Sequence, residues 1–285
     1  MPGSPAATIL GPTATPEQIA AVNAEYGFDD PLPVRYVEWL KGAVTGDLGN
    51  SLLTQREVLG DIAQRIPVTF QIAIMALLMA LVVTIPLAVY GAANAGKRLD
   101  RALTAFSSGF MSLPSFVVAV VLVYLLAVEA GAFPVTGWVP ITESLGDNLY
   151  HAFLPAVSLA VIEVGFFYRL LRGDLIATLQ EDFVLTARAK GLSGRYVLFR
   201  HALRPSLFSL LTMAGLSFGR LLGGSVIVEA FFALPGLGQL AVNSVPFKDI
   251  PTIQGIVVFV AVVYVLVNTV VDLTYTLIDP RIQVR

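Results

Sequence analysis

Five long apolar stretches, separated by polar connections, dominate this sequence. A helix that crosses about 30 Å of hydrocarbon needs roughly 20 mostly apolar residues, because all its backbone polar groups must be paired within the segment. The stretches run from Val68 to Gly91, Ala105 to Val128, Asn148 to Leu171, Pro205 to Val228 and Ile253 to Ile278. The pattern therefore predicts an all-α, polytopic transmembrane helix bundle with five spans in residues 68–285.

Composition agrees with lipid as the solvent for most of the chain. The 285 residues are 56% hydrophobic and 13% charged, with a mean hydropathy of +0.77, which exceeds what a soluble core requires. A net charge of −2 provides no basic excess for a phosphate backbone, so no nucleic-acid partner is expected. The chain has no cysteine, and its two histidines, His151 and His201, are far apart. We therefore expect neither a metal site nor a cysteine nucleophile.

Lysine and arginine are distributed unequally between the two sets of connections. Residues 97–101 hold three of them, 172–204 hold six and 279–285 hold two, whereas the opposite set of connections holds five. Short basic connections stay in the cytoplasm, so this bias places the C-terminus inside and residues 1–67 outside. The predicted location is the cytoplasmic membrane.

Residues 1–67 form a polar, acidic segment with three helix signals. Thr15-Pro16-Glu17-Gln18 has the pattern of a capping box, and Gly27 is a candidate end for that helix. Two further helices are predicted over 34–40 and 55–65. We expect a small extracytoplasmic helical segment that either shields the outer mouth or docks an external partner. Because nothing in this segment would carry it across the membrane, we also expect that a first transmembrane helix is missing before it.

The connection from Arg172 to Arg204 is too long for a simple turn. Asp182 suits a helix N-cap and Gly191 a C-terminal stop, and Ser193 suits the cap of a second helix that runs to Arg204. The first helix would hold Thr186, Ala187, Arg188, Ala189 and Lys190. Small alanines let another backbone come close, and the cations can donate to a partner's carboxylates. Such a helix fits a groove on another protein, although a basic loop that is helical through propensity alone has the same pattern.

Two charges fall inside the predicted spans. Glu163 and Arg220 each cost roughly 2.5 to 3.5 kcal/mol at the centre of a membrane, so both are expected to face the interior of the protein. They either pair with each other or contact a substrate. Pro114 removes a backbone donor from the second span, which predicts a kink there.

Two further features concern the fourth span and the connection after it. Gly215, Gly219 and Gly223 recur at four-residue spacing, which favours close packing of helices within the chain or against a partner, or else a hinge. The following connection contains Phe231 and Pro235 in an apolar run. We expect it to dip back into the protein, because facing lipid it would leave backbone groups unpaired. It is our candidate for an outer gate.

Several motifs occur in an order that resembles a known family. The segment from Asp182 to Ser193 followed by Arg200-His-Ala-Leu-Arg204 is similar to the cytoplasmic coupling loop of binding-protein-dependent ABC importer permeases. The family's Glu-Ala-Ala pattern falls on Leu185, Thr186 and Ala187, so its glutamate and first alanine are absent here. The proline of its later Leu-Pro is displaced to Pro205.

Matches along the rest of the chain resemble dipeptide and oligopeptide permeases of the first-subunit type. They are Pro2-Gly-Ser-Pro-Ala, Thr15-Pro-Glu-Gln-Ile, Gly46-Asp-Leu-Gly, Ser112-Leu-Pro-Ser-Phe, Pro235-Gly-Leu-Gly and Ile278-Asp-Pro-Arg-Ile. The resemblance implies the fold of a type I ABC importer transmembrane domain. It also implies a homologous second permease, two cytoplasmic ATPase subunits, an extracytoplasmic substrate-binding protein and a peptide substrate. Nickel and glutathione importers share the permease pattern and are the alternatives.

The resemblance also implies how energy reaches the chain. Residues Asp182 to Leu192, with Arg200, would sit in the groove of an ATPase subunit and move as a rigid lever between outward and inward access. The sequence contains no Gly-x-x-x-x-Gly-Lys-Ser/Thr motif, so ATP and Mg would be used by the partner subunits and the chain itself would be non-catalytic. A stand-alone secondary transporter is disfavoured, because the hydropathy pattern is not repeated within the chain.

Overall fold

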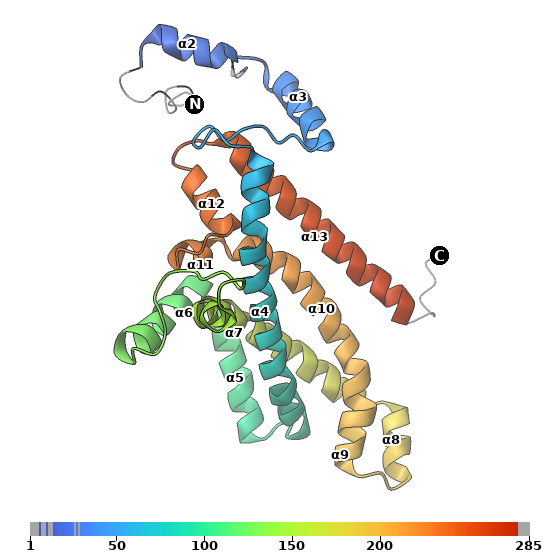
Figure 1. Ribbon diagram of the computed structural model, residues 1–285. Coiled ribbons are helices and arrows are strands. Elements are labelled where there is room, and N and C mark those ends of the chain that lie inside the picture. Colours follow the sequence, from blue (N-terminus) through green and yellow to red (C-terminus); the bar gives the residue numbers. More distant parts are fainter. Residues whose placement is uncertain (1–5, 7–9, 11–13, 26, 28, 279–285) are drawn as a thin grey trace.

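The computed structural model describes residues 6, 10, 14–25, 27 and 29–278 (Figure 1). Within these residues the chain is α-helical without β-strands, and a single isolated bridge joins Asn50 and Glu57. The prediction of an all-α fold is therefore confirmed. The predicted basic tail at 279–285 and most of the motif at 2–6 lie outside the described residues.

Four helices of the described chain are long and apolar enough to cross a membrane. They are α4 (Val58–Ala93), α7 (Leu145–Thr178), α10 (Leu203–Gly224) and α13 (Ile250–Ile278). The short helix α9 (Gly194–Tyr196) and the π-helical turn η2 (Val197–Ala202) continue into α10, so that one helix runs from Gly194 to Gly224. The predicted boundary at Pro205 is therefore wrong, since this proline lies inside that helix, directly after the wider π-helical turn.

The predicted second span is not one straight helix. It consists of α5 (Arg98–Ser112), followed by α6 (Ser115–Leu122) and the π-helical turn η1 (Val123–Glu129), and the two parts meet at 104°. Leu113 has φ −92° and ψ 129°, the extended backbone that a following proline favours. Pro114 then takes the N-cap position of α6. The expected kink is therefore a complete break of the helix.

This bent pair still carries the chain back across the bundle. Asp100, at the start of α5, pairs with Arg172 near the end of α7, with Nη2 of the arginine 2.7 Å from Oδ2 of the carboxylate. The connection after η1 reaches the opposite end, where residues 138–142 lie against residues 64–71 near the start of α4. Counted as one span, the bent pair raises the number of crossings in the described chain to five.

The outer N-terminal segment contains α2 (Pro16–Glu25) and α3 (Leu32–Thr45), which includes the helix predicted over 34–40. The capping box is present, because the amide of Thr15 donates to Oε1 of Gln18 at 2.9 Å and the amide of Gln18 donates to Oγ1 of Thr15 at 3.3 Å. The separate helix predicted over 55–65 does not form. From Val58 onward its residues belong to α4, which runs through Pro67.

Helix α7 lies at the centre of the bundle and packs on α4, α5, α6 and α10. The buried stripe of α4 contains mostly small side chains and includes Ile72, Ala73, Ala76 and Ala80, all fully enclosed. Further along the same helix, a Cβ on Gly91 would overlap the hydroxyl group of Tyr168 on α7. Small side chains at such positions let the backbones of α4 and α7 approach closely.

The three glycines of α10 differ in their surroundings. A Cβ on Gly215 would overlap Val271, and one on Gly219 would overlap Tyr264, both of which belong to α13. These two glycines therefore serve helix packing within the chain. Gly223 has open space at the same position, so the predicted stripe is only partly used among the described residues.

The start of α13 is tied to the outer N-terminal segment. Asp249 is buried and accepts three hydrogen bonds, from the hydroxyl of Ser51, the amide of Leu52 at 2.9 Å and the hydroxyl of Thr252 at 2.7 Å. A buried carboxylate needs such donors, because burial without them is costly. The loop at 51–52 is thereby fixed on the last helix.

Candidate functional site

The connection between α7 and α10 forms a helical hairpin, which we call the inner hairpin (residues 179–202). Its first helix, α8 (Asp182–Ala189), begins one residue earlier than predicted, with Glu181 at the N-cap position and Asp182 in the first turn. Gly191 has φ +82° and ends the helix, as predicted, since left-handed backbone favours glycine. Ser193 caps the second arm, as its Oγ accepts from the amide of Tyr196 at 3.4 Å.

The side chains of the inner hairpin divide into two sets. Val184, Ala187 and Val197 are buried against one another and against Leu179. Ala187 therefore packs inside the hairpin and does not face a partner, contrary to expectation. The remaining predicted coupling residues are exposed: Asp182, Thr186, Arg188, Ala189, Lys190, Gly191, Leu192 and Arg200.

An apolar surface accompanies these exposed residues. Phe183, Leu185 and Phe199 are 49%, 50% and 58% exposed. Phe183 and Leu185 belong to α8, and Phe199 belongs to the second arm, so both arms of the hairpin expose large apolar side chains as well as cations. The exposed part of the inner hairpin thus includes apolar side chains in addition to the cations and alanines that the sequence prediction names.

The inner hairpin is attached rigidly to two spans. Three residues separate α7 from α8, and the second arm continues into α10 without interruption. The hydroxyl groups of Thr178 and Ser206 lie 3.4 Å apart and join the two spans where they enter the hairpin. Figure 1 shows α8 and α9 at the end of the bundle opposite the start of α4. The hairpin is thus continuous with α10 and is joined to α7 by a short connection.

Glu163 of α7 and Arg220 of α10 form an ion pair. Nη2 of Arg220 lies 3.0 Å from both carboxylate oxygens and also donates to Oγ of Ser217 at 2.9 Å. The guanidinium carbon lies 5.2 Å from the ring centre of Phe166, within cation–π range. The Glu163 side chain is 4% exposed and that of Arg220 is 54% exposed. The pair is thus buried on one side and open on the other.

The connection between α10 and α13 is mostly helical, with α11 (Val226–Phe231) and α12 (Leu237–Ser244) joined by a turn. We call residues 232–238 the outer turn. Phe232, Leu234 and Leu237 are almost completely buried, so the expectation that this connection dips into the protein is correct. Phe231 remains partly exposed and contacts the ring of Phe232 edge-on, with centroids 5.1 Å apart.

A buried carboxyl group, which lies outside the spanning helices, holds the outer turn in place. Glu229 is fully buried; its Oε1 accepts from Oγ of Ser225 at 2.8 Å and its Oε2 from the amide of Gly238 at 2.7 Å. Burial raises the pKa of this carboxyl. The amide of Leu237 donates to Oγ1 of Thr69 at 2.9 Å, which joins the turn to α4.

The two glycines of the outer turn are required by this arrangement. A Cβ on Gly236 would overlap the Glu229 carboxylate, and one on Gly238 would overlap the backbone of Val226. The motif Pro235-Gly-Leu-Gly238 therefore has a local explanation, because its glycines let the backbone close over the carboxyl group.

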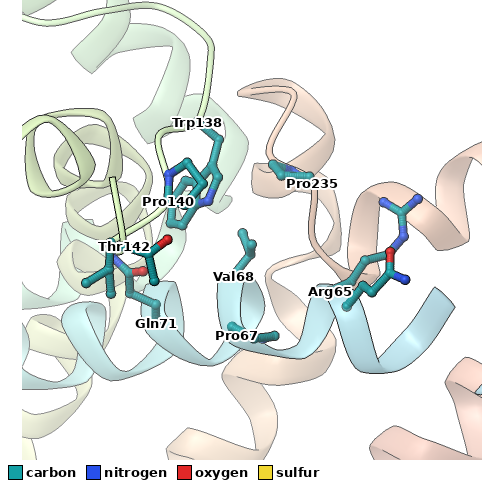
Figure 2. Close-up of a pocket in the computed structure, with 10 residues that line it drawn as sticks. Arg65, Pro67, Val68, Gln71, Trp138, Pro140, Thr142 and Pro235 are labelled. Atoms are coloured by element: carbon teal, nitrogen blue, oxygen red, sulfur yellow. The ribbon is translucent and has the colours of Figure 1, made fainter. Parts of the chain in front are cut away.

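A cavity of about 500 Å³ lies between this turn and α4. We call it the outer pocket. Its walls come from α4, from the connection at 138–142 and from Pro235 of the outer turn (Figure 2). The predicted gate residue Pro235 thus lines a cavity, whereas Pro114, Glu163, Arg220 and Phe231 do not line it.

Two stretches resemble a hydrolase motif and a phosphate-binding motif in sequence, but neither lies in the local structure that the motif requires. Gly215-Leu-Ser-Phe-Gly219 matches the Gly-x-Ser-x-Gly pattern, but it lies within α10, not on a strand-to-helix turn, and Ser217 is buried beside Arg220. Residues 91–98 approach a phosphate-binding loop but have Arg98 in the last place, and Gly91 belongs to α4, where it lies against Tyr168. Neither stretch indicates catalysis.

Sequence reasoning missed Glu229, Asp249 and the apolar surface of the inner hairpin. Glu229 stands in the apolar run Val226-Ile-Val-Glu-Ala-Phe231, and a carboxylate in such a run is as costly as Glu163. The predicted span ended at Val228, which placed this carboxylate in a solvated connection. Asp249 offered a weaker signal, because an acidic residue before a helix is usually a solvated cap.

Comparisons with known proteins agree with this arrangement. A family described as binding-protein-dependent transport system inner membrane component matches residues 84–284, and the N-terminal family of such components matches residues 1–73. A relative from Sinorhizobium fredii, named "Probable peptide ABC transporter permease protein", is 39% identical over 99% of this chain and 90% of its own length. The glutathione transport system permease protein GsiC of Escherichia coli K12 is 34% identical over all of this chain and 90% of its own length.

Solved structures show the same fold at low identity. A structure of the MetNI methionine ABC transporter in inward-facing conformations matches with a TM-score of 0.64 and 17% identity, over 77% of this chain and 96% of that one. A structure of an amino acid ABC transporter with histidines matches with a TM-score of 0.53 and 14% identity, over 83% and 96%. The transmembrane bundle, its matched family and its full-length relatives agree, and the chain belongs to the family of binding-protein-dependent transport system inner membrane components.

Proposed function

We propose that this chain is the permease subunit of an ABC importer that moves di- or oligopeptides across the cytoplasmic membrane. Its partners are a homologous second permease, two cytoplasmic ATPase subunits that use ATP and Mg, and an extracytoplasmic substrate-binding protein. The chain itself is non-catalytic. The names of the relatives support a peptide as the cargo, and glutathione, which is itself a tripeptide, is the second candidate because of the relative from Escherichia coli.

The inner hairpin carries this proposal. Its exposed apolar and cationic side chains form a surface of the kind that docks on another protein, and its two arms continue into α7 and α10. An ATPase subunit that binds this surface moves both spans when it moves. Coupling then requires no nucleotide chemistry in this chain.

The open side of the Glu163–Arg220 pair supports a translocation pathway. A half-exposed guanidinium that faced lipid would carry a large cost, so its open side faces either water or the second permease. Because Glu163 already neutralises the arginine, the pair can border a water-filled path without a net charge. We also propose that this ion pair contacts the substrate.

We infer the orientation from the ends of the helices. The start of α13 is bound to the outer loop at 51–52, so its end lies on the side of the inner hairpin. We propose that this side, with the C-terminus, is cytoplasmic, in agreement with the excess of lysine and arginine there.

The test compares uptake with ATP hydrolysis in proteoliposomes that contain the complete transporter. Replacing Arg188 and Lys190 by glutamate, together, should remove binding-protein-dependent peptide uptake while the ATPase subunits retain basal hydrolysis. The matched control reverses Lys97 and Arg98, two exposed cations on the same side of the bundle but outside the inner hairpin. This control should leave coupling unchanged.

Two outcomes would overturn the proposal. Peptide uptake by this chain alone, in liposomes without ATP, would favour a stand-alone secondary transporter. Uptake of nickel or another non-peptide cargo by the complete transporter, without uptake of peptides or glutathione, would exclude the peptide assignment.

A further inference from the structure

We propose that the outer pocket is a substrate site, where a peptide released by the binding protein is held through its C-terminal carboxylate by Arg65. This inference rests on the proposed function, because it assumes a peptide as cargo. The size, charge and rigidity of the pocket are properties of this chain alone.

The size and lining of the outer pocket suit a short peptide. Its volume of about 500 Å³ lies within the range of small-molecule sites. Trp138, Pro140 and Val68 provide apolar walls, as Figure 2 shows, and the backbone of a peptide can lie against such walls without regard to its sequence. This is appropriate for a transporter that accepts different side chains.

The charge of the outer pocket selects an anionic group. Arg65 is a lining residue, and the other polar lining residues are the neutral Gln64, Gln71 and Thr142. Within the described part of the chain Arg65 has no ion-pair partner, and no carboxylate lines the pocket. An arginine binds a carboxylate through charge-assisted, often paired hydrogen bonds. In Figure 2 Arg65 lies on the side of Val68 that is away from Trp138, so the carboxylate end would point away from the indole.

The walls of the outer pocket are fixed before any ligand arrives. Asn148 is fully buried, donates to the carbonyl of Val139 at 2.7 Å and is hydrogen-bonded to Gln71, which holds the 138–142 connection on α4. On the other side, Glu229 and Thr69 hold the outer turn that carries Pro235. A preformed site loses less conformational entropy on binding than one that must be ordered.

Photo-crosslinking in the working transporter tests this site. Trp138 is replaced by p-benzoylphenylalanine in the complete transporter, reconstituted with its binding protein, and radiolabelled trialanine is the probe. Irradiation during turnover should attach the label to this chain. Ile141, which lines the same pocket and is half-exposed, provides a second position if the Trp138 variant does not assemble.

Variants of the arginine identify the contact. In the crosslinking background, Arg65→Gln should lower the labelling about tenfold, whereas Arg65→Lys should retain most of it, because a cation remains. Arg56→Gln removes the same charge from an exposed position of the outer segment outside the pocket. Because solvent and salt screen such a charge, this control should change the labelling less than about twofold.

The outcomes separate this inference from the proposed function. Uptake of trialanine without labelling from either position would overturn the site and leave the proposed function standing. Crosslinks to the binding protein, with no label on this chain, would show that the pocket is a docking surface for that protein and would also overturn it. A complete transporter that imports no peptide would overturn the proposed function, and the site with it.

Discussion

The two connections that flank α10 have opposite characters. The outer turn buries Phe232, Leu234 and Leu237 almost completely and encloses the carboxyl group of Glu229. The inner hairpin exposes about half of Phe183 and more than half of Phe199. Both connections are rich in apolar residues, so composition alone does not distinguish them. The difference is that one packs on its own chain and the other does not.

The two connections therefore differ in what they stabilise. The outer turn has its hydrogen-bond partners on α4 and α11, and therefore it is complete within one chain. The inner hairpin has only the small buried cluster around Val184, and its remaining apolar side chains are exposed, which we propose are covered by an ATPase subunit. Substitutions in the outer turn should therefore affect the stability of this chain, whereas substitutions on the hairpin surface should affect its association with other subunits.

The largest expected effect concerns association. Replacing Phe183, Leu185 and Phe199 by serine removes three half-exposed apolar side chains, each worth about 1 kcal/mol when buried by a partner. Binding of the ATPase subunits to the purified permease pair should weaken about a hundredfold. Thermal unfolding of the pair without ATPases should change little; a large loss of stability would mean that these side chains belong to the core of the permease.

The second effect concerns the buried carboxyl group. Glu229→Ala leaves the buried amide of Gly238 without its acceptor, whereas the hydroxyl of Ser225 can still donate to the carbonyl of Leu222; the loss costs about 2 kcal/mol in the free energy of unfolding. Glu229→Gln preserves the shape and should cost less than about 1 kcal/mol. The control is Glu143→Ala, at an exposed position of another outer connection, which should have no measurable effect. Equal melting temperatures for all three variants would contradict the role of Glu229.

The third effect is local backbone strain in the inner hairpin. Gly191 has φ +82° and open space where a Cβ would stand, so Gly191→Ala brings strain of about 1 kcal/mol without a steric clash. Gly191→Asn should be milder, because asparagine tolerates the left-handed region. Binding-protein-stimulated ATP hydrolysis should decrease in that order of strain. Unchanged coupling in the alanine variant would show that the left-handed stop is not needed.

The smallest effect is a dependence of stability on pH. Burial raises the pKa of Glu229 above the ordinary value of 4.5, so the folded chain keeps a proton that the unfolded chain releases. The stabilisation is therefore full below the unfolded pKa and is lost as the pH rises through the folded pKa. The melting temperature of the wild type should fall relative to that of Glu229→Gln as the pH is raised above 4.5. Parallel pH profiles would contradict this.

Sequence patterns predicted the positions of the spans well, but they predicted the breaks and boundaries of the helices poorly. Length and apolar content located α4, α7 and α13, because lipid requires long apolar helices. The break at Pro114 exceeded the predicted kink, since proline restricts the preceding Leu113 as well as its own amide. The pattern does not predict the continuous helix over 194–224, because proline usually ends a helix, whereas helices within a bundle tolerate it.

The sequence predicted where the inner hairpin lies and where its two arms meet, but not which of its side chains are buried. Gly191 and Ser193 were identified correctly as local signals, because each acts on its own backbone. Which face of α8 points outward depends on its contact with η2, so the buried position of Ala187 could not be deduced from spacing alone. Glu229 required knowledge that the chain turns back into the protein after α10, which is a tertiary property.

The anchor at Asp249 has a consequence for the order in which this protein acquires its structure. Its carboxylate binds groups that precede it by 198 and 197 residues, so these contacts cannot form until nearly the whole chain has been synthesised. Contacts between such distant positions close late, because a long loop must be ordered first. A chain interrupted before Asp249 would leave Ser51 and Leu52 without their acceptor. The junction between the 51–52 loop and the start of α13 is therefore completed late, as the final helix is inserted.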